Sequence, residues 1–284
     1  MPDKFPMRFD QEKNRKPEKD VVEESRPEPK TADGNKKIAD TYISNGRVHE
    51  AITRYKKAAR MEDSSEHRTD LGDAYSFAEL SVKAIEQYRR AIKKNPADPE
   101  PYFGLAEVYA RFGKWHSAIT EFNMAVELKP DSAFYRYKLS TAYIHAEMIQ
   151  DAAAQMEQAV LLSPGDAFYW FELASMYADL RLDVQAVEAM VQAVTLSPND
   201  DYYTSRLGML YMRIDEPEKA AEAFRDTIRI NPRKQAYRFL LGDIYQCQGF
   251  ETRAESQYNE AQHLDRYDED FIGRARKYMS GEKW

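Results

Sequence analysis

The residue types that most often carry catalysis or bind metals are sparse in this sequence and lie far apart. The five histidines show no i, i+4 pairing, and they are His49, His67, His116, His145 and His263. Such spacing provides neither a pair of metal ligands on one helix face nor a nucleophile beside a base. Glycine-rich loops that could hold a phosphate are also missing. We therefore predict a protein that is not an enzyme and has no cofactor or metal site.

Two further candidates for chemistry have simpler structural explanations. Asp200 and Asp201 adjoin at a predicted helix start, where a carboxylate accepts hydrogen bonds from free backbone N–H groups. Cys247 is the one cysteine of the chain, so an intramolecular disulfide or a thiolate metal cage is excluded. We expect its thiol to be free and buried or half-buried. This cysteine usage favours a reducing compartment.

The composition describes a soluble, mildly acidic protein. The 284 residues include 41 Lys and Arg against 48 Asp and Glu, which gives a net charge of −7. That balance argues against binding to nucleic acid or to an anionic membrane, since both require a basic surface. Direct membrane insertion is not expected, because no apolar run reaches the length of about 18 residues that a spanning helix needs. The charged N-terminus does not resemble a secretory signal, and we predict a cytoplasmic location.

Residues 1–31 differ from the rest of the chain. They hold eight acidic and eight basic residues and five scattered prolines. So little apolar surface cannot offset the entropy cost of ordering the backbone. We predict that this segment is a disordered tail.

From residue 32 onward the sequence repeats with a period of about 34 residues. Proline recurs at that interval at Pro96, Pro130, Pro164, Pro198 and Pro232. A tyrosine recurs as Tyr42, Tyr75, Tyr109, Tyr143, Tyr177, Tyr211 and Tyr245. Nine residues after each tyrosine stands an alanine, namely Ala51, Ala84, Ala118, Ala152, Ala186, Ala220 or Ala254. A fixed period of this size is the signature of a repeat architecture.

Within each repeat the conserved spacings are helical. Large and small residues recur at offsets of three, four and seven, which predicts two amphipathic helices in each unit. The proline ends the second helix because it lacks an N–H and its ring obstructs the preceding turn. Asp98, Asp131, Asp166 and Asp200 follow the prolines closely and are predicted to cap the next helix. The chain is therefore predicted to be a stack of antiparallel helix pairs.

These residues resemble the tetratricopeptide repeat family, whose 34-residue unit carries the same order of Leu, small residue, Tyr, Ala, aromatic residue, Ala and Pro. The resemblance covers Ala32 to Asp268. It implies an all-α, right-handed solenoid. The seven predicted units are 32–64, 65–98, 99–132, 133–166, 167–200, 201–234 and 235–268. A C-terminal helix at 269–280 is predicted to cap the apolar end of the stack, with 281–284 frayed.

The same resemblance implies that one face of each first helix lines a concave groove that binds partner segments. The groove columns are acidic in the first three units and aromatic in units four to six. The predicted partner-binding residues are Asp40, Asp73, Phe103, Glu107, Arg111, Phe134, Tyr137, His145, Phe168, Phe171, Tyr202, Met209 and Phe239. Such a groove favours a protein or peptide partner that combines basic and apolar side chains.

Each part of this surface has a plainer alternative. The aromatic rings could pack only against the first helix of the adjacent unit and so belong to the wall of the solenoid. The acidic residues could form an ordinary solvated face. We keep both alternatives beside the groove hypothesis.

The N-terminal tail begins with a short motif that matches the predicted groove. Lys4 and Arg8 alternate with Phe5, Met7 and Phe9. This motif could dock in the groove of its own chain or of another copy, which would make self-association possible. The alternative is a tail that only improves solubility.

Taken together, these features predict a non-catalytic scaffold or assembly adaptor that binds a protein segment. Two other hypotheses stay open. The chain could be a self-assembling structural module whose tail docks in a neighbouring groove. It could also be a regulatory subunit of a larger enzyme complex.

Overall fold

The computed structural model describes residues 29–263 and 268–284. These residues form fifteen α-helices and no β-strand. The first helices of successive pairs are α1 (Ala32–Ser44), α3 (Ser65–Phe77), α5 (Pro99–Arg111), α7 (Ala133–His145), α9 (Ala167–Asp179), α11 (Asp201–Arg213) and α13 (Gln235–Cys247). The second helices are α2 (Val48–Met61), α4 (Ser81–Lys94), α6 (Trp115–Leu128), α8 (Ile149–Leu162), α10 (Asp183–Leu196), α12 (Pro217–Ile230) and α14 (Glu251–Gln262). The chain ends with α15 (Glu269–Met279).

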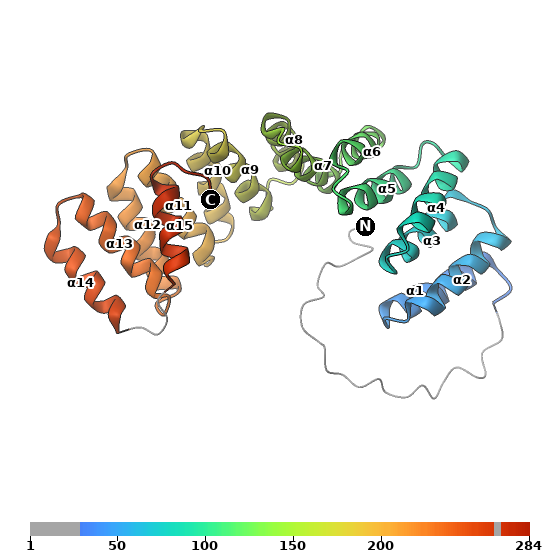
Figure 1. Ribbon diagram of the computed structural model, residues 1–284, viewed down its shortest axis with the longest axis horizontal. Helices are drawn as coiled ribbons and strands as arrows, with labels where there is room; N and C mark the ends of the chain where they lie inside the picture. Colours follow the sequence, from blue (N-terminus) through green and yellow to red (C-terminus); the bar gives the residue numbers. More distant parts are fainter. Residues whose placement is uncertain (1–28, 264–267) are drawn as a thin grey trace.

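Helices α1 to α14 pack as successive pairs, which we call units one to seven. Each first helix contacts the second helix of its own unit, and each second helix contacts the first helix of the next. Figure 1 shows the pairs following one another along an arch, with α1 and α14 at opposite ends. The predicted all-α solenoid is confirmed. The surface formed by the odd-numbered helices α1 to α13 is called the first-helix face below.

The first helices begin where polar side chains cap them. Thr31, Ser64, Asp98, Asp166 and Asp200 each accept a hydrogen bond from a backbone N–H in the first turn of the helix that follows. In unit four the cap is Ser132, whose hydroxyl accepts from the Tyr135 N–H at 3.2 Å. The prediction of Asp131 as that cap is therefore wrong by one residue, because the helix begins at Ala133.

The turn between the two helices of each unit uses one left-handed residue. The fourth residue after the repeated tyrosine has a positive φ in all seven units, with the lowest value, 58°, at Asp215 and the highest, 76°, at Gly249. Three of the seven are glycine, and the others are Glu79, Glu147, Arg181 and Asp215. Glycine adopts this conformation without steric cost, whereas other residues are held in it by the packed helices on both sides.

The core lies between the helices, where small residues allow close approach and large ones fill the space. The ring of Tyr88, 1% exposed, lies so close to Gly72 of its own unit and Gly104 of the next that a Cβ at either glycine would come within 2.6 Å or 2.5 Å of it. The repeated alanines are equally buried, with Ala51, Ala84 and Ala118 at 0% exposure. This contrast of sizes sets the spacing of neighbouring helices.

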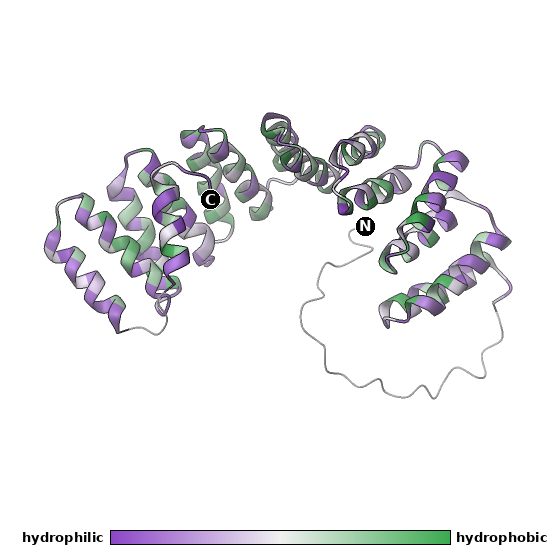
Figure 2. Ribbon diagram, in the orientation of Figure 1, coloured by the Kyte–Doolittle hydropathy of each residue, from purple (hydrophilic) through white to green (hydrophobic). Residues whose placement is uncertain are grey.

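The C-terminal helix is present, but it does not cover the end of the stack. Helix α15 contacts α11 and α13, the first helices of units six and seven. Figure 1 shows it running beside α11, away from the outer side of α14. The reason is the polar character of α14, in which Ala254 and Ala261 are the buried residues and which Figure 2 shows as largely hydrophilic. That end of the stack has little apolar surface for α15 to bury.

Within residues 281–284, which were predicted to be frayed, Glu282 and Lys283 are exposed but Trp284 is packed. The indole of Trp284 packs edge-on against Phe271, with ring centroids 5.7 Å apart, and against Tyr278 at 5.6 Å. The predicted tail motif, Lys4 to Phe9, lies outside the described residues, and its docking stays a prediction.

Candidate interaction surface

An aromatic stripe runs along the first-helix face from unit three to unit six. It consists of nine rings in three equivalent groups of three, which are Phe103, Phe134 and Tyr135, then Tyr137, Phe168 and Tyr169, then Phe171, Tyr202 and Tyr203. Each group bridges two neighbouring first helices. The stripe is therefore a direct consequence of the repeat, because residues 34 apart occupy equivalent places on α7, α9 and α11.

Within each group one ring is half-buried and another is open to solvent. Phe103 stacks on Tyr135 with ring centroids 4.9 Å apart, and Phe171 stacks on Tyr203 at 5.0 Å. Phe134, Phe168 and Tyr202 remain 45%, 37% and 37% exposed. Part of the stripe thus joins neighbouring units, as the plainer alternative held, while a row of three large rings on successive helices stays available to a ligand.

A carboxylate lies inside the stripe. Burial raises the pKa of Glu172 on α9. Besides burial, the negative charge of Glu172 helps to raise the pKa of both Tyr137 and Tyr203, so this carboxylate lies near both rings. Among the described residues Glu172 has no ion pair, unlike Lys138 at the equivalent position of unit four, which pairs with Glu107 at 3.3 Å. Glu172 is therefore a carboxyl group between aromatic rings with no cationic partner among the described residues.

A hollow of about 260 Å³ lies at the unit-three end of the stripe, between α5 and α7. Its wall includes Glu107, Arg111, Trp115 and Lys138. Arg111 is anchored there, since its guanidinium donates to the Ser76 carbonyl at 2.8 Å. His145 stacks on Trp115 with ring centroids 4.0 Å apart. The structure therefore brings Glu107, Arg111 and His145, which the sequence predicted separately, to one hollow. Phe134 is linked to the same place through Lys138, whose ammonium lies 5.6 Å from the centroid of the Phe134 ring.

The two aspartates of units one and two that were predicted to line the groove, Asp40 and Asp73, already have partners inside the protein. The Tyr55 hydroxyl donates to Asp40 at 2.5 Å, and the Tyr88 hydroxyl donates to Asp73 at 2.7 Å. Unit seven repeats the pair, with Tyr258 donating to Asp243 at 2.9 Å. In the other four units the tyrosine position holds Phe or Met and the aspartate position holds Glu, Thr, Ser or Met. The two positions therefore vary together, with Asp present where Tyr is present. This hydrogen bond was not predicted from the sequence, because each position was considered alone.

Two expectations for units six and seven, those for Met209 and Cys247, are contradicted by the structure. Met209, predicted to face a partner, is 0% exposed and belongs to the same apolar cluster as Ile272 and Ala275 of α15. Phe239 is half-buried and packs on Tyr258 of its own unit, with ring centroids 5.9 Å apart. Cys247 is exposed, so the expected burial of its thiol is wrong. It is the last residue of α13, where the neighbouring turn leaves it uncovered.

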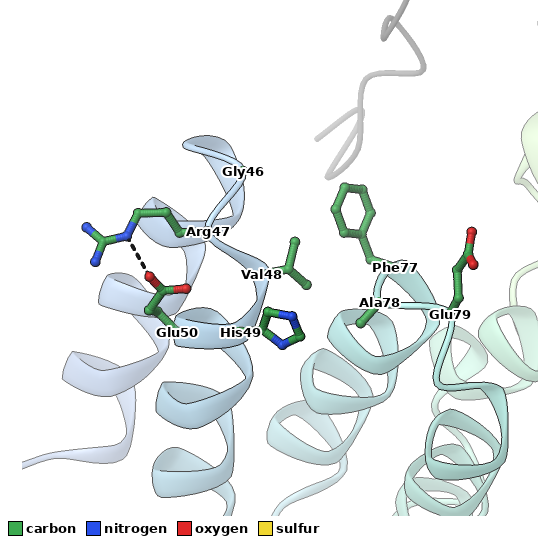
Figure 3. Close-up of a pocket in the computed structure, with 8 residues that line it drawn as sticks. All are labelled: Gly46, Arg47, Val48, His49, Glu50, Phe77, Ala78 and Glu79. Atoms are coloured by element: carbon green, nitrogen blue, oxygen red, sulfur yellow. Dashed lines mark hydrogen bonds and ion pairs between the residues drawn. The ribbon is translucent and has the colours of Figure 1, made fainter. Parts of the chain in front are cut away.

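A second hollow, of about 550 Å³, lies where the α1–α2 turn approaches the end of α3 (Figure 3). Arg47 and Glu50 form an ion pair at 3.0 Å on one side, and the half-exposed ring of Phe77 stands on the other. His49 is the one imidazole in its wall. This lining provides no nucleophile beside a base, and nothing in it extends the aromatic stripe.

The described residues contain neither a metal site nor a membrane span. No group of three or more His, Cys, Asp or Glu side chains within 29–263 and 268–284 could hold a metal ion. In the same residues, no helix combines the length and apolar character that crossing a bilayer requires.

Comparison with known families agrees with this geometry. A TPR repeat model matches residues 83–113, and a tetratricopeptide repeat model matches residues 137–201 and 205–269. Both matched regions lie within the stacked helix pairs. The chain belongs to the tetratricopeptide repeat family, and the resemblance seen in its repeated residues is confirmed.

Solved structures of the same fold align with most of the solenoid. YrrB, described as a TPR protein with an unusual peptide-binding site, is 21% identical, with 68% of this chain and 99% of that chain covered and a TM-score of 0.56. MamA is 22% identical, with 61% and 97% covered and a TM-score of 0.52. PilF of Pseudomonas aeruginosa is 16% identical, with 76% and 97% covered and a TM-score of 0.58. At these identities the similarity establishes the fold. No curated protein matches this chain in sequence.

Proposed function

We propose that this protein is a non-catalytic scaffold that binds a protein segment along the aromatic stripe of units three to six. The tetratricopeptide fold supports a role in protein interaction. The observation that carries the finer proposal is the row of exposed rings, Phe134, Phe168 and Tyr202, on three successive first helices. Large aromatic side chains at the centre of a surface contribute most of the binding free energy in many interfaces.

The charge pattern supports a basic partner. Glu172 has no cationic partner among the described residues and lies near Tyr137 and Tyr203, so a Lys or Arg of the partner would meet both a carboxylate and ring faces there. The chain contains a model of this contact one unit earlier. Lys138 lies between the Glu107 carboxylate at 3.3 Å and the Phe134 ring at 5.6 Å. We therefore propose a partner segment that alternates basic and aromatic or aliphatic side chains.

The hollow beside Trp115 would receive one of the partner's apolar side chains. Its wall combines the Trp115 and Phe122 rings with the ion pair of Glu107 and Lys138. A cavity of about 260 Å³ is large enough for a single aromatic or aliphatic side chain, and the surrounding charges would fix its direction of entry.

Fluorescence anisotropy with short labelled peptides tests this proposal. Peptides in which Lys alternates with Phe and Leu are expected to bind the full chain, whereas peptides with Glu in place of Lys are not. Phe168→Ala and Glu172→Gln should each weaken binding at least about tenfold, the loss typical of a central contact.

Two control variants separate the stripe from general surface effects. Leu161→Ala removes an apolar side chain on α8 that is 72% exposed, and Glu121→Gln removes a carboxylate on α6 whose pKa is also raised by burial. Both should bind the peptides like the unaltered chain. Equal binding by all four variants, or equal binding of the Lys and Glu peptides, would contradict the proposal.

A further inference from the structure

Helix α15 lies outside the repeat pattern, and the repeats do not determine where it packs. The helix lies on the first-helix face of units six and seven, next to the point where the aromatic stripe ends at Tyr202. It thus occupies the same kind of surface that the stripe exposes in units four and five. What covers this part of the face is therefore a segment of the chain itself.

The contact has the form of an amphipathic helix bound in a groove. Phe271, Ile272, Ala275 and Tyr278 are 6%, 1%, 0% and 1% exposed, and their spacing of one, four and seven places them on one side of α15. The opposite side carries Lys277, which is exposed, whereas the exposed Arg274 lies at the edge of the contact with its guanidinium 5.4 Å from the centroid of the Trp284 ring. This pattern is how a short helix anchors to an apolar surface through a few large side chains.

One ion pair fixes the helix in place. The Arg276 guanidinium donates to the two carboxylate oxygens of Asp243 on α13, at 2.7 Å and 2.9 Å. The pair is partly open to water, because the Arg276 side chain is 50% exposed. The two hydrogen bonds of this ion pair fix the orientation of Arg276 on Asp243, and a competing partner can reach the pair from solvent.

The far end of the contact is poorly matched in polarity. Arg206 of α11 is 2% exposed and lies between two rings of the C-terminal segment, 4.1 Å from the Tyr278 centroid and 4.3 Å from that of Trp284. Its Nε and Nη1 atoms have no hydrogen-bond acceptor among the described residues. Burial lowers the pKa of this guanidinium. Cation–π contact compensates the cost of burying the Arg206 charge only in part. Moving Tyr278 and Trp284 away would return the guanidinium to water, which lowers the cost of separating this end of α15 from α11.

We propose that α15 with Trp284 is an exchangeable internal ligand, and that α11 and α13 form a second binding surface for an amphipathic helix. A partner for this surface carries large apolar side chains at the spacing of Phe271, Ile272 and Tyr278, followed by a basic residue opposite Asp243. Displacement of α15 exposes Met209 and Arg206 on α11 and so opens the first-helix face beyond the end of the aromatic stripe. This inference does not depend on the peptide chemistry proposed for the stripe.

The test uses the full chain and a labelled peptide of residues 268–284 added in trans. In the unaltered protein the tethered helix acts at an effective concentration of about a millimolar, so a micromolar peptide is excluded. Arg276→Asp removes the ion pair with Asp243 and should allow the peptide to bind at least about tenfold more tightly. Lys277→Asp makes the same change of charge on the exposed side of α15 and should leave the peptide excluded.

A second readout follows the helix directly. With Trp115→Phe and Trp170→Phe, Trp284 is the sole tryptophan, and its quenching by acrylamide reports whether it stays packed. Quenching should increase with Arg276→Asp and not with Lys277→Asp. A peptide that itself carries Arg276→Asp should bind at least about tenfold more weakly than the unaltered peptide.

Circular dichroism checks that the Arg276→Asp variant keeps its helices. If it does not, Trp284→Ala, which removes the ring from Arg206 and leaves the buried side of α15 intact, takes its place in the peptide assay. The proposal is overturned if Trp284 stays protected and no peptide binds, since α15 is then a fixed part of the fold. It is equally overturned if Trp284 becomes exposed and the peptide still does not bind.

Discussion

At the scale of single residues, the buried tyrosine hydroxyls explain why carboxylates occur on the first-helix face of units one, two and seven. Asp73 and Asp40 accept the hydrogen bonds of the buried Tyr88 and Tyr55, and Asp243 accepts that of the half-buried Tyr258. These aspartates therefore have a structural role whether or not they also meet a partner. An acidic side chain that recurs on the first helices can thus be explained by the residue that it contacts on the second helix, without a ligand.

Replacing Tyr88 by phenylalanine removes one of these hydroxyls. Tyr88→Phe leaves Asp73 without its donor at 2.7 Å and should lower the free energy of unfolding by about 1 kcal/mol. Urea denaturation measures this difference. Tyr109→Phe is the matched control, because its hydroxyl meets only the exposed Arg89 at 3.1 Å, and its effect should stay below about 0.5 kcal/mol. Similar losses in both variants would show that the buried hydrogen bond is unimportant.

At the scale of helices, close approach between units depends on glycine where a tyrosine ring fills the gap. Gly104 lies in α5, and a Cβ at this position would come within 2.5 Å of the Tyr88 ring of the preceding unit. The ring cannot move away, because Gly72 holds it equally closely from its own unit. Unit seven repeats the within-unit contact, because a Cβ at Gly242 would come within 2.5 Å of the Tyr258 ring.

Gly104→Ala should therefore destabilise the fold by about 1–3 kcal/mol, because overpacking outweighs the better helix propensity of alanine. Thermal or urea unfolding checks this value. Gly165→Ala provides the comparison, since a Cβ there has no heavy atom within 4 Å and should cost nothing measurable. An unchanged stability for Gly104→Ala would mean that the units can separate slightly without loss.

At the scale of the whole molecule, many tyrosines share one response to alkaline pH. Burial and the Asp40 hydrogen bond raise the pKa of Tyr55, and burial and the Asp73 charge raise that of Tyr88. Burial and Glu157 raise the pKa of Tyr177 to about 12. In the unfolded chain these groups release their protons near pH 10, whereas the folded protein keeps them. Stability is therefore complete below about pH 10 and falls as the pH rises above it.

The urea midpoint measured between about pH 8 and pH 11 tests this dependence. It should be level at first and then fall, and the fall should be shallower in a variant that carries both Tyr55→Phe and Tyr88→Phe. A midpoint that does not change up to pH 11, or a decline of equal slope in the variant, would contradict the assignment of the effect to these tyrosines.

The repeated residues by themselves determine most of the fold. A tyrosine, an alanine and a proline at fixed intervals define two helices and a turn, because local helical periodicity and proline geometry act within one unit. The aromatic stripe could also be located from the sequence, since residues 34 apart must fall on equivalent places of stacked units. Phe134, Phe168 and Tyr202 are exposed on that face for this reason.

The tertiary structure alone decided which of those positions remain available. Met209 has the same sequence position in its unit as Glu107, yet it is buried, because α15 packs on α11 and α13 instead of on the polar α14. The pairing of Lys138 with Glu107 likewise depends on a contact between units, as does the lack of a cation beside Glu172 in the part of the chain that the structure describes. Helical periodicity is a local property of the chain, whereas the place where a terminal helix docks depends on the apolar surface that all the other helices leave exposed.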